Sequence, residues 1–383
     1  MHSSRRAFLR TLGAGAALRF AGSGPLGAVA SSALFEPARH DASEGQILLN
    51  SNENAYGPPP KAVAMLQAAL GQVNRYPFPR YGELTEEIAA LHKVQPNQIV
   101  LGCGSTEILR MAATALLGSG KQLVQASPTF EALENYARAV DAAVASVPLT
   151  HEYAHDLSAM MAHAHDTPSL IYICNPNNPT ASLTPRKDLE VFISRLPQSA
   201  HVLVDEAYHH FVTQSEMYQS FIENPLADDR VIVCRTFSKV YGLAGLRLGY
   251  AVAAPAMSDK LRRYATEDNI NGPVLAAAAA ALRDKSGLAA AVKRNADDRQ
   301  EFFNQAMARM LKPIDSQANF AMMNTQRPAD QVIAHFAQHN ILIGRKFPAM
   351  STHVRISFGK SNEMHEFWRV WDLLGDSGMK MKM

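Results

Sequence analysis

Short apolar runs that alternate with amphipathic segments constrain the fold of this chain more than any other feature. The runs with strand length are 98–101, 121–126, 143–149, 169–174, 201–204 and 231–234. Strands that alternate with helices predict a mainly parallel sheet covered by helices, an α/β fold. Ligands of such open sheets bind where the strands end, so the polar residues that follow each run become candidates for a site.

The richest of these polar stretches follows the apolar run 231–234. It contains a single lysine, Lys239, which lies between Arg235 and Arg247 in the sequence. A lysine amine is a nucleophile only when it is deprotonated, and nearby cations or burial lower its pKa. Ser238 and Arg247 suit an anion. The stretch predicts a Schiff-base lysine beside a phosphate site, which is the chemistry of pyridoxal phosphate; a basic loop between strands is the alternative.

Two other strand ends carry groups that this chemistry needs. Gly102 to Thr106 precede a helix, predicted over 108–117, and free backbone N–H groups at a helix start can hold a phosphate. The strand that begins at His201 ends in Asp205, whose carboxylate would keep a pyridine nitrogen protonated. Tyr208 could donate a hydrogen bond to the ring oxygen, and Glu206 is expected to face away.

The complete run 235–250 resembles the cofactor-lysine segment of fold-type I pyridoxal-phosphate aminotransferases, in particular the histidinol-phosphate aminotransferase family. The resemblance covers nearly the whole chain after residue 45. It rests on the Asn-Pro loop 175–181, Asp205 with Tyr208, Ser238-Lys239 with Arg247, and the late Val-Arg-Ile at 354–356. It implies a large domain with a mostly parallel sheet plus a smaller C-terminal α/β domain. The implied bounds are an N-terminal arm at 31–60, a large domain at 61–268 and a small domain at 269–383.

The resemblance also assigns roles to residues of this chain. It implies transamination between an amino donor and a 2-oxo acid, with no metal, in a homodimer whose active sites are shared. The catalytic residues would be Lys239, Asp205 and Tyr208. The cofactor would be bound by Ser105, Thr106, Phe130, Asn178, Asp205, Tyr208, Thr236, Ser238, Lys239 and Arg247, and by Tyr76 of the neighbouring subunit. The substrate would meet Arg355, Arg345 and Tyr56.

The sequence departs from the family pattern at three places. Phe130 stands where the family commonly has a tyrosine, and Ala181 stands where the family has a glycine, which argues against a left-handed backbone there. Residues 266–271 differ from the family's basic-Pro-aromatic-Asn step beside the substrate. The amino donor therefore stays open between histidinol phosphate, an aromatic amino acid and another amino acid. A pyridoxal-phosphate decarboxylase or lyase on the same fold is the alternative reaction.

A short metal-site pattern gives a remote alternative. His151-Glu152-x-x-His155 matches the helical zinc-protease motif, which needs both histidines on one helical face and a third ligand. Here the motif follows a strand end, and helical context is missing. A non-catalytic exported binding protein is a further alternative.

The first thirty residues resemble an export signal. Arg5-Arg6 form a twin-arginine pair, a weakly apolar stretch follows, and Ala28-Val29-Ala30 makes a cleavage site. We therefore expect residues 1–30 to be a twin-arginine signal peptide and the protein to be periplasmic; a cytoplasmic enzyme is the alternative. The apolar stretch is too short for a stable membrane span.

The composition of the chain argues against other classes of protein. The net charge is +2, but residues 1–30 hold four arginines and no acidic residue, so the rest of the chain is slightly acidic. This balance gives no reason to expect nucleic-acid binding. The three cysteines are dispersed and predict neither a disulfide framework nor a zinc site.

Overall fold

The computed structural model describes residues 45–164, 167–213 and 215–379. The predicted signal peptide lies outside these residues, as does the start of the predicted arm. The main sheet has seven strands: β2 (Ile99–Gly102), β3 (Gln122–Ser127), β4 (Ala143–Pro148), β5 (Ser169–Cys174), β6 (His201–Asp205), β7 (Val231–Thr236) and β8 (Gly249–Val252). Every strand-length run named from the sequence forms one of these strands.

The strand order in this sheet is β2-β8-β7-β6-β5-β3-β4, and only β8 runs antiparallel to its neighbours. The connections between β3, β4, β5, β6 and β7 are long enough to cross over, which parallel neighbours require. β7 returns directly to β8 through residues 237–248, so that pair is antiparallel. The sheet is thus mostly parallel, as the alternation predicts.

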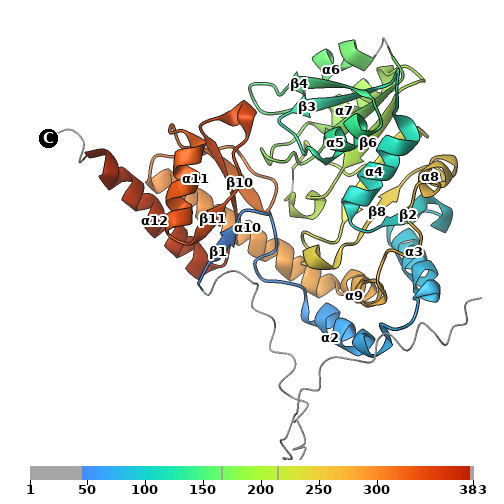
Figure 1. Cartoon of the computed structure of the whole chain (residues 1–383), viewed down its shortest axis with the longest axis horizontal. Coiled ribbons are helices and arrows are strands. Elements are labelled where there is room, and N and C mark those ends of the chain that lie inside the picture. Colours follow the sequence, from blue (N-terminus) through green and yellow to red (C-terminus); the bar gives the residue numbers. More distant parts are fainter. Residues whose placement is uncertain (1–44, 165–166, 214, 380–383) are drawn as a thin grey trace, which may run out of the picture. The chain divides into compact units, whose positions relative to one another are not determined.

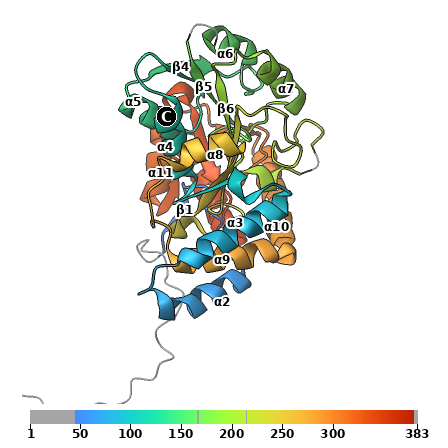
Figure 2. The ribbon, with the colours of Figure 1, turned by 90° about the vertical axis from the view of Figure 1, so that its right-hand side faces the viewer.

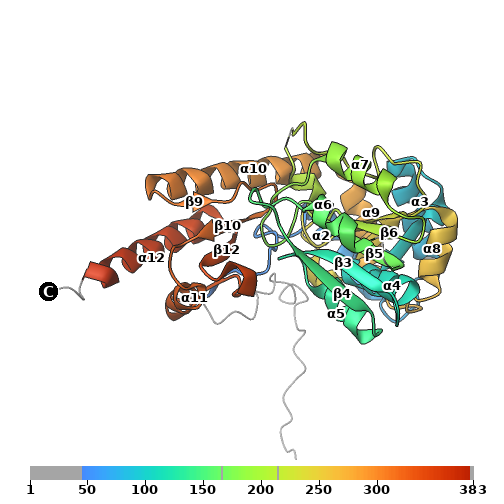
Figure 3. The same cartoon turned by 90° about the horizontal axis from the view of Figure 1, so that it is seen from above.

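Helices cover both faces of the sheet. One face packs against α4 (Ser105–Leu116), α5 (Ala132–Ala139) and α8 (Pro255–Arg262). The other packs against α3 (Phe78–His92), α6 (Leu157–Ala164), α7 (Arg186–Arg195) and α9 (Gly272–Arg283) (Figure 3). The central strand β5 is buried on both sides, because Leu170 and Tyr172 face the first layer and Ile171 and Ile173 face the second.

The predicted start of one helix is wrong. The helix predicted to start at Ile108 starts at Ser105, because the polar residues 105–107 form its first turn and Glu107 accepts a hydrogen bond from the Cys103 N–H. Helix α8 ends at Arg262, and Asp268 adopts a left-handed φ of 55° shortly afterwards. Helix α2 (Pro60–Ala69) packs on α9 beside α3 (Figure 2).

The C-terminal elements form smaller sheets with a core of their own. β10 (Phe320–Asn324) lies between β12 (His353–Ser357) and β9 (Lys312–Pro313), and β1 (Ile47–Leu49) pairs in parallel with β11 (Ile341–Ile343). They share their core with α10 (Lys285–Ala308), α11 (Ala329–Gln338) and α12 (Ser361–Met379) (Figure 1). The pairing of β1 with β11 anchors the N-terminal arm, so that residues 50–54 pass the ends of the main strands.

Candidate active site

A cavity of about 390 Å³ lies where β6 and β7 end. It contains every cofactor-binding residue predicted for one subunit, together with Arg355. The lining residues are Asn50, Ser51, Asn52, Glu53, Ser105, Thr106, Phe130, Cys174, Asn178, Asp205, Ala207, Tyr208, Thr236, Ser238, Lys239, Ala244, Arg247 and Arg355. They come from distant parts of the sequence, and the fold brings them together.

Lys239 is the reactive candidate in this cavity. Its Nζ donates hydrogen bonds to the carbonyl oxygens of Asn52 at 3.0 Å and Ser51 at 3.3 Å. Burial and then the nearby Arg355 lower the pKa of Lys239 to about 8, while Glu53 acts in the opposite direction. A substantial fraction of the amine is therefore neutral near pH 8, as a nucleophile or base requires.

Arg235 does not line the cavity that holds Lys239, although the two residues are close in the sequence. It lies on the opposite side of β7 and forms a buried ion pair with Glu206, in which Arg235 Nη2 and Glu206 Oε2 are 2.8 Å apart. Successive strand residues point to opposite faces, so Arg235 turns away from the cavity while Thr236 lines it. The expectation that Glu206 faces away from the site is confirmed by this pair.

A cradle for an anion forms where α4 starts. Arg247 reaches the hydroxyls of Thr106 at 3.3 Å and Ser238 at 3.4 Å, and Thr236 Oγ1 donates to Ser238 Oγ at 3.0 Å. A Cβ added at Gly104 would collide with the Arg247 guanidinium. A guanidinium, several hydroxyls and a helix N-terminus at one place make the donor set that a phosphate needs.

Asp205 and Tyr208 also face the cavity. Burial raises the pKa of Asp205 to about 6, and a hydrogen bond from Tyr172 opposes this rise. The Tyr208 hydroxyl accepts a 3.0 Å bond from Asn52 Nδ2. Sequence reasoning missed Asn52 and Tyr172. The cluster of asparagines after β1 was a signal for Asn52, but nothing in the apolar run 169–174 marked Tyr172 for a role.

Arg355 is buried on β12 and directed into the cavity. It donates from Nη1 to Asn178 Oδ1 at 2.7 Å and from Nη2 to the Asn50 carbonyl at 2.6 Å. Its Nε is buried and has no hydrogen-bond partner among the described residues. A buried guanidinium with a donor to spare suits an acidic group on a substrate.

The backbone at Ala181 corrects one inference from the sequence. Ala181 adopts a φ of +60°, the left-handed conformation that the alanine had argued against. The residue is buried, and hydrogen bonds hold it on both sides, from its N–H to the Asn177 carbonyl and from the Gln317 N–H to its own carbonyl. The surrounding contacts thus impose on alanine a conformation that glycine adopts without strain.

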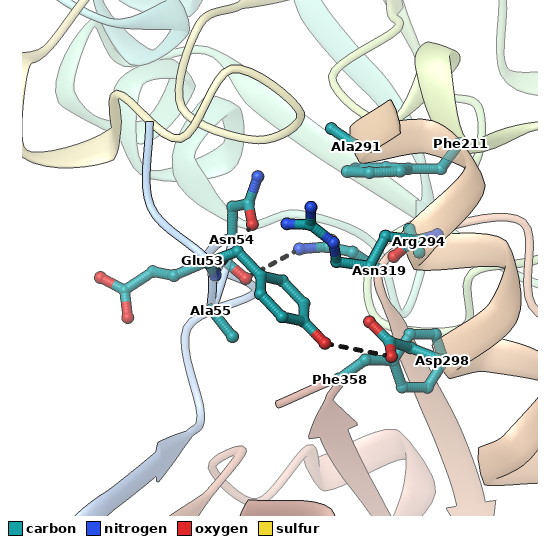
Figure 4. Close-up of a pocket in the computed structure, with 11 residues that line it drawn as sticks. Glu53, Asn54, Ala55, Phe211, Ala291, Arg294, Asp298, Asn319 and Phe358 are labelled. Atoms are coloured by element: carbon teal, nitrogen blue, oxygen red, sulfur yellow. Dashed lines mark hydrogen bonds between the residues drawn. The ribbon is translucent and has the colours of Figure 1, made fainter. Parts of the chain in front are cut away.

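The other predicted site residues lie elsewhere within the subunit. Arg345 is exposed and pairs with Glu131 at 2.5 Å, and it does not line the cavity. Tyr56 lines a separate small pocket beside α10, where its hydroxyl donates to Asp298 (Figure 4). Tyr76 is 72% exposed and stacks on Phe78. Neither Arg345 nor Tyr56 lines the cavity of its own subunit, so their substrate contacts stay predictions.

The zinc-protease motif is not formed. Residues 151–156 are turn and irregular structure, so the two histidines do not share a helical face. His155 is buried with Nδ1 2.6 Å from Thr184 Oγ1, and burial lowers its pKa to about 4. Within the described part of the chain, no group of three or more His, Cys, Asp or Glu side chains could hold a metal ion.

Comparison with known proteins agrees with this geometry. The family described as aminotransferase class I and II matches residues 44–370. The chain belongs to this family. A histidinol-phosphate aminotransferase from Moorella thermoacetica is 34% identical to this aminotransferase, over 85% of this chain and 84% of its own length. An aromatic amino acid aminotransferase from Cutibacterium acnes is also 34% identical, over 79% of this chain and 86% of its own length.

Solved structures share the fold of this aminotransferase. A protein from Erwinia carotovora atroseptica, provisionally named a histidinol-phosphate aminotransferase, has a TM-score of 0.84 and 32% identity, covering 87% of this chain and 97% of its own. The histidinol-phosphate aminotransferase of Sinorhizobium meliloti, solved in complex with pyridoxal phosphate, has a TM-score of 0.80 and 24% identity, covering 86% of this chain and 91% of its own. The likeness to the second structure shows a common fold.

Pyridoxal phosphate is the cofactor of this aminotransferase, and the cavity fits it. The cradle of Arg247, Thr106 and Ser238 matches its phosphate, the Lys239 amine matches its aldehyde, and Asp205 matches its ring nitrogen. No helix in the described residues is both long and apolar enough to cross a bilayer.

Proposed function

We propose that this aminotransferase acts on an amino donor whose acidic group binds Arg355, and passes the amino group to a 2-oxo acid. The observation that carries the proposal is the pairing of Lys239 and Arg355 in one cavity. The first supplies a base of lowered pKa, and the second supplies a buried guanidinium with an unpaired Nε. A carboxylate and a phosphate monoester both suit the planar fork of arginine.

The roles of the residues follow from their positions. Pyridoxal phosphate, when bound, supplies an electron sink for the charge that develops at the substrate's α-carbon. Lys239 would anchor the cofactor through its amine and would hold the substrate's α-proton on Nζ as a general base. Asp205 would hold a negative charge beside the ring nitrogen, and Tyr208 would donate to the ring oxygen. Phe130 would cover the ring face.

Anchoring of the phosphate is assigned to Ser105, Thr106, Thr236, Ser238 and Arg247. Asn178 would contact the ring oxygen, and its Oδ1 accepts from Arg355. The group proposed to recognise the substrate is therefore hydrogen-bonded to a group proposed to contact the cofactor. We expect Arg355→Lys to raise KM for the donor by tenfold or more, roughly the value of a charged hydrogen bond, while the cofactor's absorbance is retained.

Two donors deserve the first test, because both are named among the relatives. Histidinol phosphate would present a phosphate to Arg355, and an aromatic amino acid would present its α-carboxylate. Purified enzyme mixed with each donor and 2-oxoglutarate, with glutamate measured as the product, distinguishes them. Failure of both donors, and of a wider amino-acid panel, would refute transamination. Release of CO₂ in place of a 2-oxo acid would instead indicate the decarboxylase alternative.

We also propose that the enzyme is a homodimer in which Tyr76 completes the partner's phosphate site. In support, Val73, Tyr76 and Phe78 expose 62%, 72% and 58% of their surface, an unusual concentration of apolar side chains on a water-facing segment. Tyr76 also lies away from the cavity of its own subunit. Tyr76→Ala should weaken cofactor binding although the residue touches nothing in its own site; equilibrium dialysis of the dimer measures this.

Export by the twin-arginine route is likewise a proposal. It rests on Arg5-Arg6 and the Ala28-Val29-Ala30 site. This route carries folded proteins, so the cofactor could be inserted before export. Expression of the wild type and of Arg5→Lys/Arg6→Lys, followed by fractionation and intact mass, tests it. A mature periplasmic form starting at Ser31 in the wild type alone supports export, and equal cytoplasmic retention of both contradicts it.

A further inference from the structure

Tyr172 makes a contact with the active site that no role yet explains. It is fully buried on β5, and its hydroxyl donates a 2.9 Å hydrogen bond to Asp205 Oδ2 on the adjacent strand. Its ring packs in the apolar layer between the sheet and α4. A tyrosine hydroxyl in such a layer requires a partner. Here the partner is the carboxylate assigned to the cofactor's ring nitrogen.

The strand register explains how the two side chains meet. Cys174 pairs with Asp205 and Tyr172 pairs with Leu203, so all four side chains point to the same face of the sheet. The long tyrosine side chain spans the one step along the strands that separates it from Asp205. A shorter donor at position 172 could not reach the carboxylate without a shift of β5.

The Asp205 carboxylate is held at both oxygens. Oδ2 accepts from Tyr172, and Oδ1 accepts from the Ala207 N–H at 3.0 Å. Rotation of the carboxylate would break both bonds. Each carboxylate oxygen has a second lone pair, and Asp205 lines the cavity, so an acceptor site is left for the ring nitrogen.

We propose that Tyr172 is a positioning residue for Asp205: its buried hydroxyl orients the carboxylate and keeps it anionic, so that it faces the cofactor's ring nitrogen as a charged acceptor. This inference rests on the role given to Asp205 under the proposed function. Tyr172 itself does not line the cavity, and it acts only through Asp205.

The electrostatic setting makes this hydrogen bond important. Burial raises the pKa of Asp205 to about 6, and the bonds from Tyr172 and the Ala207 N–H are the two largest opposing effects. Burial also raises the pKa of Tyr172 far above its ordinary value, so it stays a donor throughout the working range. The other titratable groups that interact electrostatically with Asp205 are Cys174, Tyr208, Cys234 and Lys239, together with Glu206 on the opposite face of the sheet.

The test is Tyr172→Phe in the full-length holoenzyme, because this change removes the hydroxyl and keeps the ring. Tyr250→Phe is the matched control: Tyr250 is another buried tyrosine of the same sheet, and its hydroxyl meets His92 at 2.8 Å, away from the cavity. Four quantities are measured from pH 5 to 9: the visible spectrum of the bound cofactor, the dissociation constant for pyridoxal phosphate, kcat and KM.

We expect Tyr172→Phe to move the acid limb of the spectral titration and of kcat upward by about one pH unit or more, the equivalent of one lost hydrogen bond to a charge. The direction follows because loss of a donor to the anion raises the pH at which Asp205 takes up a proton. KM for the donor should change by less than about twofold, because Tyr172 touches no substrate. Tyr250→Phe should leave both limbs in place.

A double-mutant cycle separates this inference from the proposed function. In an Asp205→Asn background, Tyr172→Phe should cause no further spectral shift, because the charge that the hydroxyl serves is gone. An unshifted acid limb in folded Tyr172→Phe, or an equal shift in both backgrounds, would overturn the role of Tyr172 alone. An Asp205→Asn variant that matches the wild type would instead refute the role of Asp205.

Discussion

The ion pair between Glu206 and Arg235 offers the sharpest test of how the site is supported. Glu206 directly follows Asp205, and Arg235 precedes the loop that carries Lys239. The side chains are only 1% and 3% exposed, and Glu206 also accepts from Ser220 Oγ and the Phe221 N–H, both at 2.7 Å. The perturbation is Glu206→Gln, which keeps the shape of the side chain and removes its charge. It also replaces one acceptor oxygen by an NH₂ group, which would face groups that themselves donate hydrogen bonds.

The expected cost can be worked from the geometry. At 2.8 Å and an effective dielectric constant of about 20, the attraction between the charges is roughly 6 kcal/mol. Desolvation already offsets part of that in the wild type, and removal of one partner from a buried pair typically costs about 3–5 kcal/mol. The second carboxylate near Arg235, Glu223, is half exposed and 3.5 Å away, so it compensates little. We expect a loss of about 3–5 kcal/mol in the free energy of unfolding.

Urea unfolding at a fixed saturating concentration of pyridoxal phosphate measures this loss, since cofactor binding itself stabilises the folded state. The control is Asp297→Asn, which removes an exposed ion pair with Lys293 on α10 and should cost less than about 1 kcal/mol. A loss below about 1 kcal/mol for Glu206→Gln would refute the reasoning. A double variant gives a second test. If Arg235→Met/Glu206→Leu loses as much stability as Arg235→Met and Glu206→Leu lose separately when added together, the reasoning is also refuted, because two residues that form a pair show coupling.

Two further predictions concern the cofactor site, and a third concerns the metal hypothesis. Gly249→Ala should weaken binding of pyridoxal phosphate by tenfold or more, about the value of one lost charged hydrogen bond, since its Cβ would strike the Ser105 backbone; Gly245→Ala, which meets open space, should not. In cofactor-free enzyme, the rate at which Lys239 binds pyridoxal phosphate covalently should rise with pH through about 8, as the amine loses its proton, and stopped-flow absorbance measures this rate. Arg355→Gln should move that rise to higher pH, because Arg355 lowers the pKa of Lys239. A rise at the same pH in the variant would contradict this effect of Arg355. A chelator should leave activity unchanged, because His151 and His155 lie in turn and irregular structure and do not share the helical face that a zinc-protease site needs; inhibition that zinc reverses would reopen the metal hypothesis.

Much of the site could be predicted from the sequence because its residues lie at strand ends. Asp205, Lys239 and Arg247 each occupy a place where an apolar run gives way to polar residues, and the chemistry of each side chain suggests its use. The parallel sheet follows from the same alternation. The start of α4 was less predictable, since the polar residues 105–107, which the sequence places in a loop, form the first turn of that helix.

The tertiary structure decided what depends on direction and on distant contacts. The sequence placed Arg235 beside Lys239, but strand alternation turns Arg235 into a buried pair with Glu206 on the opposite side. The sequence argued against a left-handed Ala181, but hydrogen bonds on both sides of the residue impose one. Nothing in the apolar run 169–174 marked Tyr172, but in the folded chain its hydroxyl donates a hydrogen bond to Asp205. Residue chemistry is local and can be read along the chain, whereas the partner that each group meets is set by strand register and burial, which only the folded chain defines.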